Sequence, residues 1–193
     1  RLIEDIGNQV IKKIFTINDY DEKALDRIDE NKIINKIKTH AKKFDIIIVQ
    51  NFGHNFFTQK IIKILQKYSK KISLNVQANS LNYGFNIIGQ NFKSAKMFSL
   101  DEKELQLYAG KKDIDYLQAL KSIKKRLKSS LCYLTLGNTY SLLINKKGNA
   151  FKIPKLNNKA RDTMGAGDIF HAMASILSVT SKNDFFNLFL SQI

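Results

Sequence analysis

Two glycines separated by one alanine lie between two aspartates and an apolar segment, in the stretch "DTMGAGDIFHAMASIL" that begins at residue 162. We expect a helix to start immediately after the glycines. A helix N-terminus leaves backbone N–H groups unpaired and carries a partial positive charge, so a run of small residues there can receive an anion. Gly165, Ala166 and Gly167 have little or no side chain to keep a phosphoryl group away. They are predicted to form an anion hole.

Asp168 falls in the first turn of this predicted helix, beside the same amides. A carboxylate at that point could take the proton from a hydroxyl that attacks a phosphoryl group. A general base next to an anion hole is suited to phosphoryl transfer. Local physics leaves a second interpretation equally open, in which the glycines form a simple turn and Asp168 is a helix-start residue stabilised by the helix dipole.

The elements that would position these residues alternate between strand and helix patterns, which predicts an α/β fold with a mostly parallel sheet. Continuous apolar runs indicate buried strands, and apolar residues at helical spacing with lysines between them indicate helices. After Gly137 the pattern changes to an antiparallel hairpin at one edge of the sheet. Strands are expected at 8–19, 45–51, 72–77, 95–100 and 131–137, the hairpin at 140–154, and helices at 31–44, 58–71, 101–110 and 114–127.

Composition is that of a soluble globular domain, with 44% hydrophobic and 25% charged residues among 193. No apolar run approaches the ~20 residues of a membrane span. The net charge of +15 is spread over the whole chain as lysine, which favours a solvated surface. A nucleic-acid binder stays as an alternative whose affinity would fall steeply with salt. The single cysteine, Cys132, excludes an internal disulfide, favours a reducing cytoplasm and is expected to be buried and inert.

The three histidines and Cys132 show no zinc-ligand spacing. His171 follows Asp168 by three residues, so we expect it on a neighbouring face of the helix, either packed or exposed.

The stretch "DTMGAGDIF" resembles the D-T-x-G-A-G-D-x-F signature of the ribokinase/PfkB family of carbohydrate kinases. The resemblance implies a ribokinase-like three-layer sandwich that uses ATP and Mg²⁺ to phosphorylate a sugar or sugar phosphate. Asp168 would be the catalytic base, and Gly165 to Gly167 the anion hole. Asp162 and Thr163 would support the loop, with a monovalent cation near Asp162. In the alternative interpretation, the side chains of Asp162 and Thr163 are only hydrogen-bonded to nearby turn amides.

Three further stretches match the family in the right order. "YLTLGNTYSLLI" resembles the strand and turn that run alongside ATP, which implies nucleotide contacts for Thr135 and Gly137. "ISLNVQAN" resembles a strand end at which Asn75 approaches the nucleotide phosphates. "SLDEKELQL" resembles the N-x-x-E motif that holds magnesium through water, with Glu104 as the acid and Asp101 where the family usually has asparagine. On spacing alone, Glu104 could instead be an exposed helix acid.

Two stretches, "IVQNFGHNFFT" and residues 75–107, resemble a smaller group within the family. This group contains heptose 7-phosphate kinases and two-part proteins in which such a kinase is joined to a nucleotidylyltransferase. The first stretch usually reads D-F-G-H-G, and this chain has Asn51 and Asn55 in place of the Asp and the final Gly. Asn51 and His54 are candidate substrate contacts. The missing carboxylate favours a rival interpretation, a non-catalytic module with a role in assembly or regulation.

The resemblance runs from about residue 45 to residue 193, and more weakly before. Family members have further strands before this region, carrying a lid and a sugar pocket, and a helix after it that lines the adenine site. We therefore expect residues 1–193 to be one kinase domain that is incomplete at both ends. A strand edge left unpaired would favour a homodimer. Neither nucleic acid nor a membrane is an expected partner.

Overall fold

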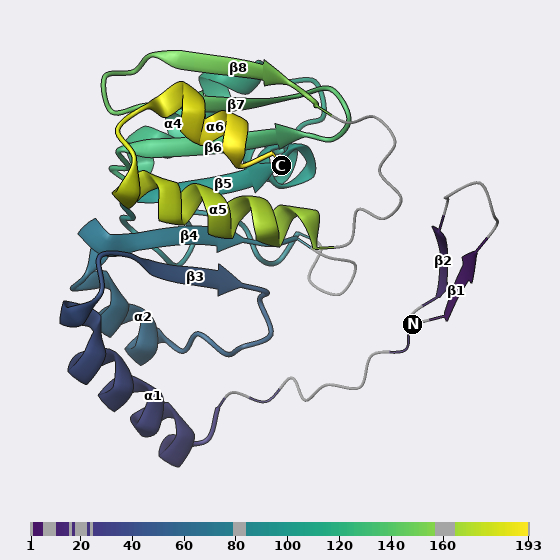
Figure 1. Cartoon of the computed structure of the whole chain (residues 1–193). Helices are drawn as coiled ribbons and strands as arrows, with labels where there is room; N and C mark the ends of the chain where they lie inside the picture. Colours follow the sequence, from purple (N-terminus) through teal and green to yellow (C-terminus); the bar gives the residue numbers. More distant parts are fainter. Residues whose placement is uncertain are drawn as a thin grey trace.

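The computed structural model describes residues 2–5, 11–15, 17, 23, 25–78, 84–156 and 165–192. Its main body is a six-stranded sheet in the order β3-β4-β5-β6-β7-β8 (Figure 1). Strands β3 to β6 run parallel, and β7 and β8 continue antiparallel as an edge hairpin, as the sequence predicted. The strands are β3 (Ile47–Asn51), β4 (Ile72–Val76), β5 (Met97–Asp101), β6 (Leu131–Leu136), β7 (Tyr140–Ile144) and β8 (Ala150–Pro154). A separate antiparallel pair is formed by β1 (Leu2–Asp5) and β2 (Ile11–Phe15).

Helices cover both faces of the sheet, which confirms the three-layer α/β sandwich. They are α1 (Arg27–His40), α2 (Gln59–Gln66), α3 (Glu102–Ala109), α4 (Tyr116–Arg126), α5 (Ala166–Thr180) and α6 (Asp184–Leu190), with 3₁₀ turns at Ala41–Lys43 and Ser69–Lys71. Successive side chains of a strand face opposite sides. In β5, Phe98 and Leu100 therefore join the core under α1 to α4, whereas Met97 joins the core under α5 and α6.

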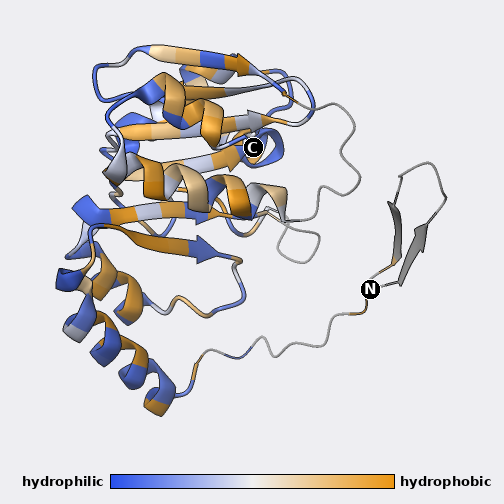
Figure 2. Cartoon of the chain, viewed as in Figure 1, coloured by the Kyte–Doolittle hydropathy of each residue, from blue (hydrophilic) through white to orange (hydrophobic). Residues whose placement is uncertain are grey.

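Apolar residues concentrate on the sheet and on the helix faces turned toward it (Figure 2). Cys132 of β6 is fully buried, and burial raises the pKa of its thiol to about 12. The expectation of a buried cysteine is therefore confirmed. Among the described residues, none of the helices is long and apolar enough to cross a membrane.

Helix boundaries differ from the sequence pattern where a polar side chain caps the end. Helix α1 begins at Arg27, four residues before the expected start, because the Asp26 side chain accepts a hydrogen bond from the Asp29 amide at 2.7 Å. Helix α2 stops at Gln66, and the rest of the predicted helix is a turn followed by a 3₁₀ turn. Helix α3 ends as predicted at Gly110, whose φ of 69° suits glycine.

Helix α4 starts after Asp115, whose carboxylate accepts hydrogen bonds from the amides of Leu117 at 2.9 Å and Gln118 at 3.0 Å. We expect Asp115→Ala to lower the free energy of unfolding by about 1 kcal/mol, because both amides lose their acceptor. Urea denaturation measures this change. Asp113→Ala, two residues earlier and outside the cap, is the control, and an equal loss in both variants would contradict the capping role.

Candidate active site

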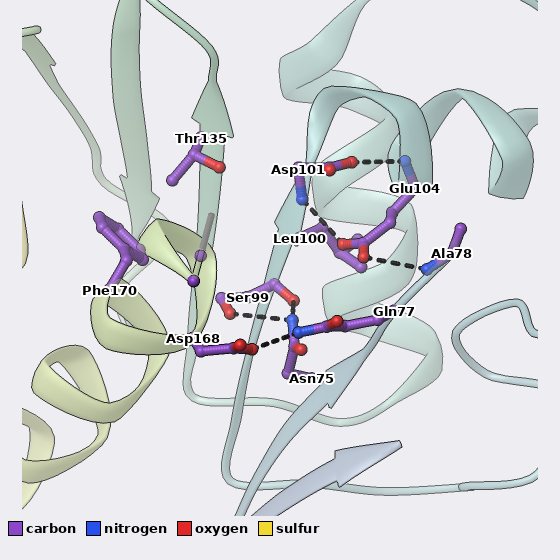
Figure 3. Close-up of a pocket in the computed structure, with 12 residues that line it drawn as sticks. Asn75, Gln77, Ala78, Ser99, Leu100, Asp101, Glu104, Thr135, Asp168 and Phe170 are labelled. Atoms are coloured by element: carbon purple, nitrogen blue, oxygen red, sulfur yellow. Dashed lines mark hydrogen bonds between the residues drawn. The ribbon is translucent and has the colours of Figure 1, made fainter. Parts of the chain in front are cut away.

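A cavity of about 180 Å³ opens where the carboxyl ends of β4, β5 and β6 meet the beginning of α5 (Figure 3). The α5 side contributes Asp168 and the glycines. The sheet side contributes Asn75, and the beginning of α3 contributes Glu104. Of the residues predicted from the sequence, the cavity brings together Asn75, Asp101, Glu104, Thr135, Gly165, Gly167 and Asp168.

The two glycines at the start of α5 have different reasons to be glycine. Gly165 caps the helix with a φ of 77°, a left-handed conformation that side chains disfavour. Gly167 lies in the first turn, and a Cβ added there would meet no atom within 4 Å. Packing of the chain does not require glycine at position 167. An open approach to the backbone is what an anion at this helix end would need.

Asp168 is held by two carboxamides from the ends of neighbouring strands. Its Oδ1 accepts hydrogen bonds from Gln50 Nε2 at 3.2 Å and from Gln77 Nε2. Gln50 belongs to β3, and Gln77 directly follows β4. Sequence reasoning missed both glutamines. The available signal was a polar side chain at the carboxyl end of each predicted parallel strand, where ligands of open α/β sheets bind.

Glu104 and Asp101 form a capping box at the start of α3. The Glu104 amide donates to Asp101 Oδ1 at 2.8 Å, and the Asp101 amide donates to Glu104 Oε2 at 2.9 Å. Glu104 Oε1 also accepts from the Ala78 amide at 3.2 Å. Glu104 is only 8% exposed, so it is not the exposed helix acid that spacing left open. Burial raises the pKa of its carboxyl to about 8, helped by the neighbouring Asp101 charge.

The sheet side of the cavity fits a hydrated cation better than a cage of direct ligands. Within the described ranges, His, Cys, Asp and Glu form no cluster of three or more that could enclose a metal ion. Magnesium usually keeps several waters and takes one or two carboxylates. This wall offers Glu104 and Asp101, together with Asn75 Oδ1, a buried oxygen that has no hydrogen-bond partner among the described residues. Such an unpaired acceptor is suited to a water on the ion.

Other candidate residues lie outside the cavity lining. Asn51 is buried, and its side chain bonds Gly53 N at 2.9 Å and Asn86 Oδ1 at 3.3 Å, which ties two loops together. His54 is half-buried in the first of these loops. Gly137 is exposed in the β6–β7 turn with a φ of 50°. The predictions for Asp162 and Thr163 concern residues outside the described ranges.

The comparison with protein families gives the class of this protein. The model of the pfkB family carbohydrate kinases matches residues 26–181, and the chain belongs to this family.

Among curated proteins, the bifunctional protein HldE of Aliarcobacter butzleri (strain RM4018) is 23% identical in an alignment of 180 residues. The alignment covers 88% of this chain and 37% of HldE. Among solved structures, phosphofructokinase-2 from Escherichia coli in complex with substrates and products superposes with a TM-score of 0.67 at 12% identity, over 87% of this chain and 55% of that one. Arabidopsis thaliana ribokinase complexed with ribose and ATP gives 0.62 at 19% identity, over 88% and 51%. The chain thus spans about half the length of these structures. Their likeness confirms the ribokinase-like fold.

Proposed function

We propose that this protein transfers a phosphoryl group from ATP to a hydroxyl of a sugar or sugar phosphate. The observation that carries the proposal is the position of Asp168, held by Gln50 and Gln77 at the start of α5. The bare backbone of Gly165 and Gly167 lines the same cavity. A base and an anion-binding helix end are thereby combined in one space.

In this mechanism Asp168 takes the proton from the attacking hydroxyl. Amides of Gly165 to Gly167 stabilise the charge on the transferring group. Thr135 and Gly137 are proposed to contact the nucleotide. Glu104 and Asp101 would hold the water shell of Mg²⁺, which when bound neutralises phosphate charge.

We further propose a heptose phosphate as the acceptor. This rests on the similarity to HldE and on the resemblance of "IVQNFGHNFFT" and residues 75–107 to heptose 7-phosphate kinases. Asn51 and His54 would contribute to that substrate end, and a monovalent cation would lie near Asp162. A fused or associated nucleotidylyltransferase and a cytoplasmic location belong to the same proposal. So does a homodimer through the edge of β3, which has no strand partner on that side among the described residues. Light scattering at high protein concentration tests the dimer, which a monomer would contradict.

A non-catalytic module is the second candidate function, and one observation favours it. The Asn51 carboxamide is already bonded to Gly53 and Asn86, where the related motif has a carboxylate. ATP binding without sugar-stimulated turnover would identify such a module. Sugar-dependent ADP release, measured with magnesium across a panel of heptose and hexose phosphates, would establish the kinase and its acceptor.

Gln77→Met tests the contact that orients the base. Methionine has a similar length but donates no hydrogen bond, so the Asp168 carboxylate loses one of the two carboxamide donors, Gln50 and Gln77. We expect kcat to fall about tenfold, the value of one hydrogen bond, with little change in nucleotide KM. Steady-state kinetics measures both. Gln118→Met on α4, outside the cavity lining, is the control, and an unchanged kcat in Gln77→Met would contradict the orienting role.

A further inference from the structure

Beneath the cavity, a buried polar cluster joins α5 to two strands of the sheet. His171 and Ser175 of α5 face Ser73 of β4 and Ser99 of β5. His171 is 0% exposed, so of the two alternatives that the sequence left open, packed or exposed, the structure shows the packed one. Ala174 of α5 and Met97 of β5 lie in the apolar core beside the cluster, and the bonds from Gln50 and Gln77 to Asp168 lie at the start of the helix. The cluster therefore supplies hydrogen bonds, which have a preferred direction, to an interface between α5 and the sheet that otherwise has few hydrogen bonds.

For a neutral imidazole, the hydrogen bonds in this cluster can run in only one direction. The Ser175 hydroxyl donates to the His171 carbonyl at 2.6 Å, so it must accept from Ser73 Oγ at 2.7 Å. Ser73 has then used its proton and accepts from His171 Nε2 at 3.2 Å. A neutral ring carries one N–H, so Nδ1 accepts from Ser99 Oγ at 2.7 Å. For a neutral ring, these bonds therefore assign the Nε2–H tautomer.

Burial supports the neutral state of this ring. Desolvation lowers the pKa of His171 to about 4, against a partial opposing effect of the contact with Ser73. At neutral pH the imidazole thus offers one donor and one acceptor, which is what the two serines require.

The two halves of the cavity come from different elements, so their spacing depends on where α5 lies on the sheet. Asp168 and the glycines belong to α5, whereas Asn75 and Glu104 belong to the sheet side. His171 lies one helical turn after Asp168 and bonds both β4 and β5. Apolar contacts alone would tolerate a small slide of the helix, because they have no preferred direction.

We propose that His171 is a positioning residue that fixes the register of α5 on β4 and β5. It thereby sets the distance between Asp168 and the opposite side of the cavity, which is formed by Asn75, Asp101 and Glu104. This inference rests on the proposed kinase function. Phosphoryl transfer requires reacting groups to be placed within about an ångström. A small slide of α5 would lower the rate of the chemical step while both substrates still bind.

The first test is the protonation state of the ring, measured without activity. The chain has three histidines, so ¹⁵N-histidine labelling gives a simple NMR spectrum. We expect His171 to show the neutral Nε2–H tautomer at pH 7. A charged ring, or the Nδ1–H tautomer, would overturn the assigned network.

The second test separates positioning from stability. We expect His171→Leu to lower kcat about tenfold to a hundredfold with KM for ATP and sugar within about twofold, and His171→Gln to recover part of kcat, since its amide can both donate and accept. Leu188→Ala removes buried volume from the same core without touching the network, and is the matched control for lost stability. All variants are assayed well below their unfolding temperature.

The outcomes distinguish this inference from the kinase proposal. If the wild-type chain is active and His171→Leu retains its kcat, or loses no more than Leu188→Ala, the positioning role is wrong and the kinase proposal stands. If the full-length wild-type protein shows no sugar-stimulated turnover in the presence of ATP and magnesium, the kinase proposal fails and this role fails with it.

Discussion

Replacing Asp168 with asparagine is expected to lower kcat by about three orders of magnitude, within the usual range for loss of a general base. Asparagine keeps an oxygen that can accept from Gln50 and Gln77, so the start of α5 should stay in place. It cannot take the proton of an attacking hydroxyl. Nucleotide affinity should therefore change little, because the amides of Gly165 and Gly167 are untouched.

Two measurements make the Asp168→Asn result specific. ADP release gives the loss of kcat, and calorimetric titration of a non-hydrolysable nucleotide shows whether binding persists. Asp115→Asn is the matched control, because asparagine caps a helix as well as aspartate does and Asp115 lies outside the cavity lining. An Asp168→Asn variant with full turnover would exclude this carboxylate as the base.

Acid is expected to destabilise the fold through His171. The ring titrates near pH 6.5 in the unfolded chain and near pH 4 in the folded one, so the unfolded state binds a proton first as the pH falls. The free energy of unfolding should then decrease between about pH 6.5 and pH 4. The full loss from this group is about 3 kcal/mol, since one pKa unit corresponds to about 1.4 kcal/mol.

The contribution of His171 is obtained as a difference between variants, because other groups titrate in the same range. Glu104 acts with the opposite sign, since its raised pKa favours the folded state on protonation. The groups facing the ring are the hydroxyls of Ser73, Ser99 and Ser175, and the nearest carboxylate placed along α5 is Asp168.

Urea denaturation across pH 4 to 7 should show a shallower pH dependence in His171→Gln, which does not titrate. Leu188→Ala, which removes no titratable group from the same core, should leave the dependence as in the wild-type chain. Equal pH profiles for wild type and His171→Gln would mean that the buried ring is not the acid-sensitive group.

The sequence was sufficient to predict the strands of the main sheet and the segment proposed to carry the chemistry. Continuous apolar runs and helical spacings of apolar residues depend only on neighbours along the chain, so the parallel strands, the edge hairpin and α3 with its terminal Gly110 were predicted within a few residues. The glycine stretch could be identified for the same reason, because the turn, the helix start and Asp168 are contiguous.

The side chains that meet at the site could not be predicted from the sequence, because they come from distant segments. Gln50 and Gln77 reach Asp168 across 118 and 91 residues of sequence, and the burial of His171 depends on serines from two other strands. Periodicity shows which face of an element is apolar, but a hydrogen bond depends on the order of strands and the register of a helix upon them. The partners of Asp168 and His171 therefore became known only once β3, β4 and β5 lay side by side beneath α5.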